Sequence, residues 1–250
     1  MMGVKKTWIL LLIIGALPVA GYAQDSQSDF REKIYHAFIH GEMDLWEGTI
    51  EEMEHYYESR RRVTMLYDLL LARYGFIAFC LDLDEKSKAR HHLEKGGDEL
   101  ERLLLYPDYT SRAKALEGAF LGFRISLRPL SAVRLGPRSY RAVDKAVEAD
   151  SNNPTAWMEK GNTRFYTPST FGGSKQEAAE YYKKAVELFE KDMQPHFRWL
   201  YLNSLVGLAK SYEYVGTSRQ VVEVYEKALE FEPRFKWVRD ELLPEAKSNH

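Results

Sequence analysis

Two histidines have the spacing of metal ligands. His36 and His40 are four residues apart, so on a helix their imidazoles would share one face and could bind one metal ion. The residue after His36 is Ala37, where the zinc-protease pattern requires glutamate, and a third ligand such as His55 would have to come from elsewhere in the fold. We therefore interpret the pair as ordinary helix-surface residues and expect no metal site.

A second motif, Gly172-Gly173-Ser174-Lys175, could bind an anion, because backbone N–H groups at a helix start attract negative charge. The phosphate-binding loop of nucleotide-binding proteins needs glycine, four residues and then Gly-Lys, and residues 165–171 do not supply that spacing. A tight turn with Ser174 as N-cap and Glu177 as its capping-box partner explains the motif. The segment is also longer than a helical hairpin requires, so a ligand-contacting insertion remains the alternative. Three aromatic residues flank it: Phe165, Tyr166 and Phe171.

Enzymatic chemistry has little support in the sequence. Cys80 is the single cysteine and lies in an apolar run, residues 74–81, so we expect a small buried side chain there. No nucleophile elbow or dinucleotide-binding fingerprint is present, and the spacing of the 37 acidic residues does not single out a catalytic pair. We therefore expect a non-catalytic protein without a cofactor.

The charge balance argues against nucleic acid as a partner. The formal net charge is −2, with 45% hydrophobic and 29% charged residues, which supports a large core and excludes a membrane-embedded chain. The most basic run, residues 60–62, follows the acidic stretch 51–58 and is interpreted as a solvated helix face. Without a strongly basic surface we expect no nucleic-acid partner.

The N-terminal segment, residues 1–23, has the features of a signal peptide. A pair of lysines precedes the apolar stretch 8–17, and Pro18 separates this stretch from a small-x-small site that ends at Ala23. The stretch is shorter than the roughly 20 residues of a spanning helix. We predict cleavage after Ala23, no stable membrane span in the mature chain, and a periplasmic or secreted location. Retention of the segment as an anchor is the alternative.

The elements that would position the candidate residues are predicted to be short helices. Asn153-Pro154 is typical of a helix start, with an N-cap followed by proline in the first turn. No segment alternates apolar and polar residues for long enough to indicate a strand, so we predict an all-α fold. Three capping-box pairs predict further helix starts: Asp44…Glu47, Ser174…Glu177 and Thr217…Gln220.

A pattern of small and aromatic residues recurs along the chain. Offsets of 0, 4 and 7 place three side chains on one helical face. Small side chains there let a neighbouring helix approach closely, and the ring between them fills the resulting groove. The pattern therefore favours helices that stack in pairs. It occurs as Ala178, Tyr182 and Ala185, as Val221, Tyr225 and Ala228, and more loosely as Ala89, Leu93 and Gly96.

With Pro233 following Ala228, this pattern resembles the second helix of the tetratricopeptide repeat (TPR). The segment from Asn152 to Gly161 resembles the start of the family's first helix, Asn-Asn-Pro-x-x-Trp-x3-Gly. The resemblance is most specific over about residues 140–235 and implies antiparallel helix pairs. A weaker similarity, based on Gly-Gly-x-Lys, is to the periplasmic TPR proteins that accompany transporters.

The spacing of the repeats predicts the overall architecture. The positions that close successive repeats are 43, 50, 39 and 43 residues apart, whereas the family period is 34. We predict one α-solenoid over residues 24–250, made of about five TPR-like helical hairpins, with residues 234–247 as a C-terminal capping helix. The closing positions are Met53, Gly96, Ala146, Ala185 and Ala228.

The resemblance also implies where a partner would bind. First helices of TPR proteins line a concave groove, and Asn162 resembles one element of the clamp that holds peptide carboxylates, although Met158 stands where a lysine would be needed. We therefore predict a non-catalytic scaffold that binds a protein or peptide in this groove. The alternative is a small-molecule or transporter-accessory module with a pocket at residues 165–173. The predicted binding residues are Asn162, Phe165, Tyr166, Phe171, Lys210 and Glu213.

Overall fold

The computed structural model describes the backbone of residues 20–248 and the side chains of residues 26–217 and 219–248. Within this part of the chain there are eleven α-helices and no strand, which confirms the predicted all-α fold. Most of the predicted signal peptide, residues 1–19, lies outside the described residues, and residues 20–23 belong to the first helix.

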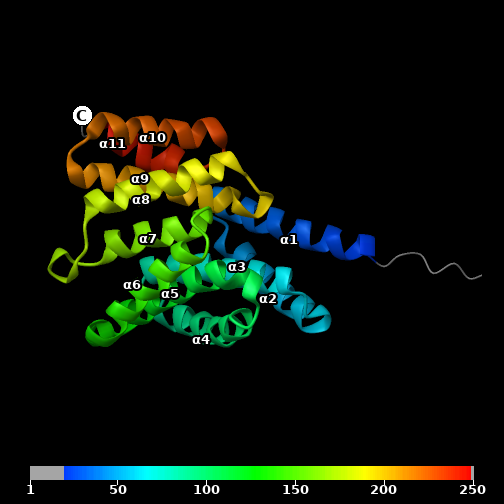
Figure 1. Cartoon of the computed structure of the whole chain (residues 1–250). Coiled ribbons are helices and arrows are strands. Elements are labelled where there is room, and N and C mark those ends of the chain that lie inside the picture. The colour runs from blue at the N-terminus through cyan, green and yellow to red at the C-terminus, as the bar shows by residue number, and fades with distance from the viewer. Residues whose placement is uncertain (1–19, 249–250) are drawn as a thin grey trace, which may run out of the picture.

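The helices form five antiparallel hairpins, each pairing an odd-numbered helix with the next even-numbered one, and α11 caps the C-terminal end (Figure 1). This arrangement confirms the predicted α-solenoid. Short 3-10 turns begin at Pro107, Pro129, Ser169 and Pro195, and a π-helical segment, Val238–Leu242, precedes α11. The helices are α1 (Ala20–His40), α2 (Met43–Arg60), α3 (Val63–Asp82), α4 (Lys86–Leu103), α5 (Thr110–Leu127), α6 (Ala132–Ala149), α7 (Pro154–Tyr166), α8 (Lys175–Lys191), α9 (Arg198–Val215), α10 (Ser218–Phe231) and α11 (Leu243–Ser248).

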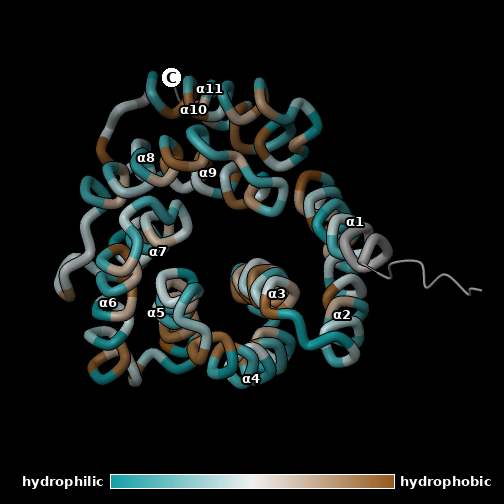
Figure 2. The backbone as a smooth tube through the Cα atoms, turned by 45° about the vertical axis from the view of Figure 1, so that its right-hand side comes forward, coloured by the Kyte–Doolittle hydropathy of each residue, from teal (hydrophilic) through white to brown (hydrophobic). Residues whose placement is uncertain are grey.

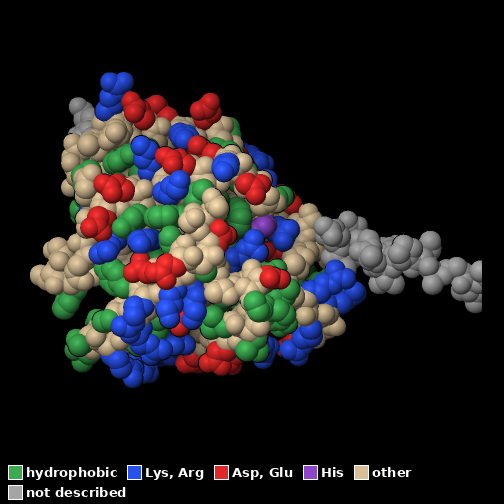
Figure 3. Space-filling model, viewed as in Figure 1, with side chains coloured by type: hydrophobic (Ala, Val, Ile, Leu, Met, Phe, Trp, Pro, Cys, Tyr) green, Lys and Arg blue, Asp and Glu red, His purple; other side chains and the backbone are tan. Residues whose placement is uncertain are grey.

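The hairpins follow one another around a common axis. Figure 2 shows α3, α5, α7 and α9 on the inner side of this ring, with α4, α6, α8 and α10 outside them. The face of the molecule drawn in Figure 3 mixes acidic and basic side chains, as expected from the nearly balanced charge. We call the side of α1, α3, α5, α7 and α9 that faces the axis the inner wall.

Two of the predicted helix starts are capped as expected. The Ser174 side chain accepts a hydrogen bond from the Glu177 backbone N–H at 3.2 Å. The Asn153 side chain accepts one from the Thr155 backbone N–H at 3.1 Å, and Pro154 is the first residue of α7. Each side-chain oxygen satisfies a backbone donor that the first helical turn leaves without a partner.

The other two capping boxes were predicted wrongly. The left-handed backbone of Gly41 (φ +72°) lets the Glu42 N–H bond to the Ala37 carbonyl, so α2 begins at Met43 and Asp44 lies inside its first turn. Thr217 does occupy the N-cap of α10 but makes no side-chain cap. Its hydroxyl instead donates to the carbonyl of residue 212 at 3.2 Å in the preceding helix.

The TPR-like packing is clearest around Tyr182 of α8. Its side chain is 2% exposed and lies against Gly161 of α7 and Gly207 of α9. A Cβ atom at Gly161 would approach the Tyr182 ring to 2.9 Å, and one at Gly207 to 2.6 Å. The two glycines therefore let neighbouring helices approach the ring closely. Tyr225 of α10 is fully buried in the corresponding way, so both tyrosines pack between helices as predicted.

The solenoid closes on itself, a feature that no pattern in the sequence predicts. The Phe38 ring of α1 lies 5.8 Å from Trp199 of α9 and 5.1 Å from Phe235. The Tyr35 hydroxyl donates to the Glu232 carboxylate at 2.9 Å. Aromatic pairs of this kind contribute about 0.5–1.5 kcal/mol each beyond their burial. The first helix is thus joined to the last repeat.

Helix α3 is the central helix of the fold. Its length and composition would allow it to cross a membrane, but 72% of its most apolar stretch is buried inside the protein. Its contacts with α2, α4 and α5 account for this burial. We therefore attribute its apolar character to the core.

Candidate functional site

The predicted binding residues do not form one continuous surface. Phe165 of α7 is buried, and its ring packs 5.0 Å from Tyr166 and 5.6 Å from Tyr214 of α9. Tyr166 and Phe171 are exposed, at 73% and 67%. Phe165 is therefore a packing residue, while Tyr166 and Phe171 are available for contact.

The two predicted groove residues of α9 have structural contacts of their own. The Lys210 ammonium lies 4.7 Å from the centre of the Trp237 ring, in the C-terminal segment. Glu213 accepts a hydrogen bond from the Tyr225 hydroxyl at 3.3 Å. These contacts join α9 to the elements that follow it and do not bring the two side chains together with Asn162.

Asn162 belongs to a group of polar side chains that the sequence did not reveal. Its side-chain N–H groups donate to the Tyr74 hydroxyl of α3 and to the Glu159 carboxylate, each at 3.0 Å. The Tyr182 hydroxyl donates to the Asn162 carbonyl oxygen at 2.5 Å. We call Tyr74, Glu159, Asn162 and Tyr182 the inner polar cluster. It joins α3, α7 and α8, and Asn162 is its one partly exposed member.

Glu159 is the unusual member of this cluster. It is 2% exposed, and no lysine or arginine in the described part of the chain forms an ion pair with it. Burial raises the pKa of this carboxyl to about 7, although hydrogen bonds from Tyr74 and Asn162 favour the charged form. The carboxyl can therefore gain or lose a proton near neutral pH. A buried group of this kind is typical of functional sites.

Aromatic side chains adjoin the cluster. The Tyr74 ring lies 5.6 Å from Phe123 of α5 and 6.2 Å from Trp199 of α9, and Trp199 lies 5.2 Å from Trp46 of α2. Phe123 and Asn162 are only partly buried, in contrast to Tyr74 and Trp199. The inner wall thus combines apolar ring surface with a few hydrogen-bonding groups, the usual composition of a small-molecule site.

The 165–173 segment is held rigidly. A Cβ atom at Gly173 would lie 1.7 Å from the Thr167 carbonyl oxygen, so only glycine fits there. The Arg164 guanidinium donates to the Gly172 carbonyl at 2.7 Å. Lys175 turns inward, where its ammonium donates to the Phe165 carbonyl and lies over the Phe165 ring. This lysine is therefore used within the fold instead of facing an anion.

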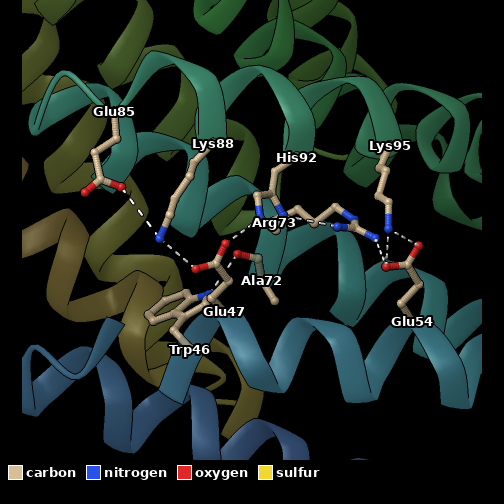
Figure 4. Close-up of polar contacts among 9 residues, drawn as sticks. All are labelled: Trp46, Glu47, Glu54, Ala72, Arg73, Glu85, Lys88, His92 and Lys95. Carbon is tan, nitrogen blue, oxygen red and sulfur yellow. Dashed lines mark hydrogen bonds and ion pairs between the residues drawn. The ribbon is translucent and has the colours of Figure 1, made fainter. Parts of the chain in front are cut away.

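A buried ion-pair network lies between α2, α3 and α4 (Figure 4). Arg73 is fully buried and pairs with Glu99 at 2.8 Å and with Glu54 at 3.0 Å. His92 contacts Arg73 at 3.2 Å, and burial lowers its pKa to about 4, so it is neutral at pH 7. Because the charges of Arg73, Glu54 and Glu99 are paired, we interpret the network as structural, in contrast to Glu159.

A small cavity lies where α1 meets α3 and α9. Arg31, Asp68, His196 and Trp199 line it together with apolar residues. One Asp68 oxygen accepts from Arg31 at 2.8 Å, while the other, and His196 Nδ1, have no hydrogen-bond partner in the described structure. The volume of about 20 Å³ suits one water molecule and is too small for an organic ligand.

The histidine pair of α1 lies beside Glu42 of the following turn. The His36 and His40 rings lie 4.4 Å apart, and His36 Nε2 is 3.4 Å from a Glu42 oxygen. Among the described residues, no three His, Cys, Asp or Glu side chains converge as metal ligands would.

No protein-family model matches the sequence, and no curated protein matches it. The fold is similar to that of the HusA haemophore from Porphyromonas gingivalis, with a TM-score of 0.65 and 16% identity over 79% of this chain and 96% of that protein. A second solved structure, MamA protein, aligns with a TM-score of 0.39 and 15% identity over 89% of this chain and 97% of that one. The chain has a TPR-like α-solenoid fold, as its helix pairs and the burial of Tyr182 and Tyr225 indicate.

Proposed function

We propose that this protein is a non-catalytic binding protein that holds a small, flat, largely apolar ligand against the inner wall. The observation that carries the proposal is the inner polar cluster, in which a buried carboxyl that no lysine or arginine of the described residues pairs with adjoins aromatic rings. Ring surfaces would supply most of the contact area. The partly buried Asn162 amide would orient the ligand through a hydrogen bond, and the buried Glu159 carboxyl would hold that amide in place.

Closure of the solenoid supports a compact ligand over a long peptide. In an open solenoid an extended peptide can lie along the whole inner surface. Here Phe38 and Trp199 join α1 to α9, so part of the inner wall is already covered by the protein's own rings. The uncovered part includes the partly buried Asn162 and the exposed Tyr166, and we place the ligand there.

Haem is the first ligand to test, because a haemophore shares the fold over 96% of its length. The residues present are compatible with it. Tyr166 lies four residues after Asn162, on the same helical face, and the residue as a whole is exposed, although desolvation raises the pKa of its hydroxyl. Tyrosine can act as an axial haem ligand, and aromatic side chains can pack against a porphyrin face. Tyr166 would contact the iron, while the partly buried Phe123 would contact the ring.

The test is titration of the purified protein with haemin, followed by haem absorbance and by quenching of tryptophan fluorescence. Saturable binding with one haemin per chain is expected, weakened at least about tenfold in Asn162→Ala because a hydrogen-bonding group of the site is lost. Tyr166→Phe should change the iron spectrum but leave binding of iron-free protoporphyrin intact. Tyr106→Phe, an exposed tyrosine in the turn before α5, is the matched control. Unsaturable binding, or equal effects of all three variants, would overturn the proposal.

A protein or peptide partner is the second candidate. The observation in its favour is a set of exposed aromatic side chains, Tyr166, Phe171 and Tyr214, at the turns after α7 and α9. Exposed aromatic residues are common anchors of protein interfaces. Replacing Phe171 and Tyr214 with alanine should abolish capture of such a partner and leave haemin binding unchanged. If these residues instead belong to the small-molecule site, the same substitutions would weaken haemin binding, and that result would contradict a separate protein interface.

We also propose that the protein acts outside the cytoplasm after cleavage at Ala23. The lysine pair, the apolar stretch and the small-x-small site of residues 1–23 support this location. N-terminal sequencing of the protein recovered from cell fractions tests it. A chain that begins at Gln24 is expected, and an intact N-terminus in the cytoplasmic fraction would contradict the proposal.

A further inference from the structure

One stretch of the chain departs sharply from the overall charge balance. The whole sequence has 35 basic and 37 acidic residues, yet residues 118–143 contain five arginines and no aspartate or glutamate. This stretch covers the second half of α5, the turn that follows and the first two thirds of α6. We call the hairpin formed by residues 118–145 the basic hairpin.

The basic side chains of this hairpin point to solvent and lack ion-pair partners. On α6 they follow helical spacing, because the opposite face of the helix, including Leu135 and Val143, is buried against α5. None of them forms an ion pair within the described chain, although elsewhere exposed lysines and arginines commonly do, as Lys160 does with Asp144 at 2.8 Å. The exposed basic residues are Arg124, Arg128, Arg134, Arg138, Arg141 and Lys145.

Two apolar side chains project from the end of the same hairpin. Leu130 is 98% exposed and Val133 is 81% exposed, the two highest values among the large apolar residues of the described chain. The two helices of this hairpin are held together closely. The Ser139 hydroxyl of α6 donates to the Gly118 carbonyl of α5 at 2.8 Å, and α5 and α6 pack closely at Gly118. The end of the hairpin, formed by the turn and the first residues of α6, therefore exposes two apolar side chains to water in the described structure.

The position of this turn matters as much as its composition. Turns within hairpins lie at one edge of a solenoid, and Figure 1 shows those after α5, α7 and α9 on the left side of the molecule. Figure 3 shows Lys and Arg side chains gathered at the lower left, around the turn between α5 and α6. The exposed aromatic side chains Phe171 and Tyr214 belong to the neighbouring turns of this edge. The turns at this edge thus expose apolar or aromatic side chains, and the turn between α5 and α6 also has basic side chains beside them.

We propose that the basic hairpin docks on an anionic lipid bilayer. The arginines would contact lipid phosphates, and Leu130 and Val133 would insert at the level of the headgroups. Arginine matches phosphate geometry and can keep its charged end at the interface while its stem is buried. The apolar side chains lie on a protruding tip, and the charged side chains lie on either side of it. This shape fits the flat, deformable surface of a bilayer better than the pocket of a folded acidic protein. Aromatic residues at the adjacent turns suit the same interface.

Vesicle flotation tests this inference. Purified protein is mixed with vesicles of equimolar phosphatidylglycerol and phosphatidylcholine, or of phosphatidylcholine alone, at about 0.1 M salt, where exposed charges act over about 10 Å. Binding to the anionic vesicles alone is expected. Each basic residue at an anionic surface contributes about fivefold in affinity, so Arg134→Gln with Arg138→Gln and Arg141→Gln should weaken binding on the order of a hundredfold. These residues are exposed, so the variant should remain folded, which circular dichroism checks.

Matched controls separate the hairpin from general effects of charge and hydrophobicity. Replacing Lys183, Lys184 and Lys191 of α8 with glutamine removes the same charge from another exposed surface and should change binding far less. Leu130→Ser with Val133→Ser should weaken binding about tenfold or more, because the inserted apolar area is lost. Leu105→Ser, at an exposed leucine of the opposite edge, should not. Absence of binding to the anionic vesicles would overturn the proposal, and it is the result expected if the partner is an acidic protein. An equal loss of vesicle binding in the α8 variant and the arginine variant would also overturn it.

Discussion

Replacing Glu159 with glutamine isolates the most unusual group in the structure. The glutamine side chain has nearly the same shape and can still accept a hydrogen bond from Asn162, but it carries no charge at any pH. The variant therefore removes one titration and leaves the packing of α7 almost unchanged. Glu180→Gln, at an exposed position of α8, controls for the loss of one acidic residue.

The magnitude follows from the pKa of the buried carboxyl. Burial raises it from 4.5 to about 7, and each unit corresponds to about 1.4 kcal/mol. Between these values the unfolded chain releases the proton while the folded protein keeps it, so the free energy of unfolding falls as pH rises and levels off above about pH 7. The total loss from this one group is on the order of 3 kcal/mol.

Urea denaturation of the parent and the variant, from about pH 4 to about pH 8, measures this effect. The difference between the two free energies of unfolding should change by about 3 kcal/mol across this range, with the glutamine variant relatively more stable at high pH. Taking the difference cancels other titrations, including that of His92, whose lowered pKa destabilises the fold in acid. A difference that stays constant with pH would show that Glu159 is not desolvated and would refute the reasoning.

Two further substitutions test the packing. Gly207→Ala would place a Cβ atom 2.6 Å from the Tyr182 ring and should lower the free energy of unfolding by about 1–3 kcal/mol. Its control is Gly122→Ala, where no atom lies within 4 Å of the added Cβ, and this variant should be neutral or stabilising by up to about 1 kcal/mol. Equal effects of the two substitutions in urea denaturation would contradict the close approach at Tyr182. Arg73→Ala should cost about 3–5 kcal/mol because Glu99 is left buried and unpaired, and Arg73→Met combined with Glu99→Leu should recover much of this loss. A cost for Arg73→Ala below about 1 kcal/mol, measured by the same method, would show that the network is solvated.

The hairpins and their order could be predicted because their signals are local. The residues that close each repeat, such as Ala185 and Ala228, are fully buried in the second helices. Tyr182 and Tyr225 pack as the spacing of small residues indicates. Helix starts were less secure, since the capping box at Asp44 was overridden by the tight turn at Gly41.

The site was only partly predictable, because its key relations join distant parts of the chain. Asn162 was found through its resemblance to a TPR groove position, but its partner Tyr74 is 88 residues away. Glu159 carries a weak signal, in that it lies three residues before Asn162 and so shares its face. No sequence pattern could show that Glu159 lacks a cation, or that Lys210 is turned toward Trp237.

The contact of α1 with α9 has a consequence for how this protein can change over evolution. An open array of repeats can gain or lose a unit at either end, since each unit touches only its neighbours. Here Phe38 meets Trp199 only when five hairpins complete the circumference. Duplication or deletion of one hairpin would move these rings apart and expose both, so the repeat count is fixed by geometry and variation is confined to the turns and the surface.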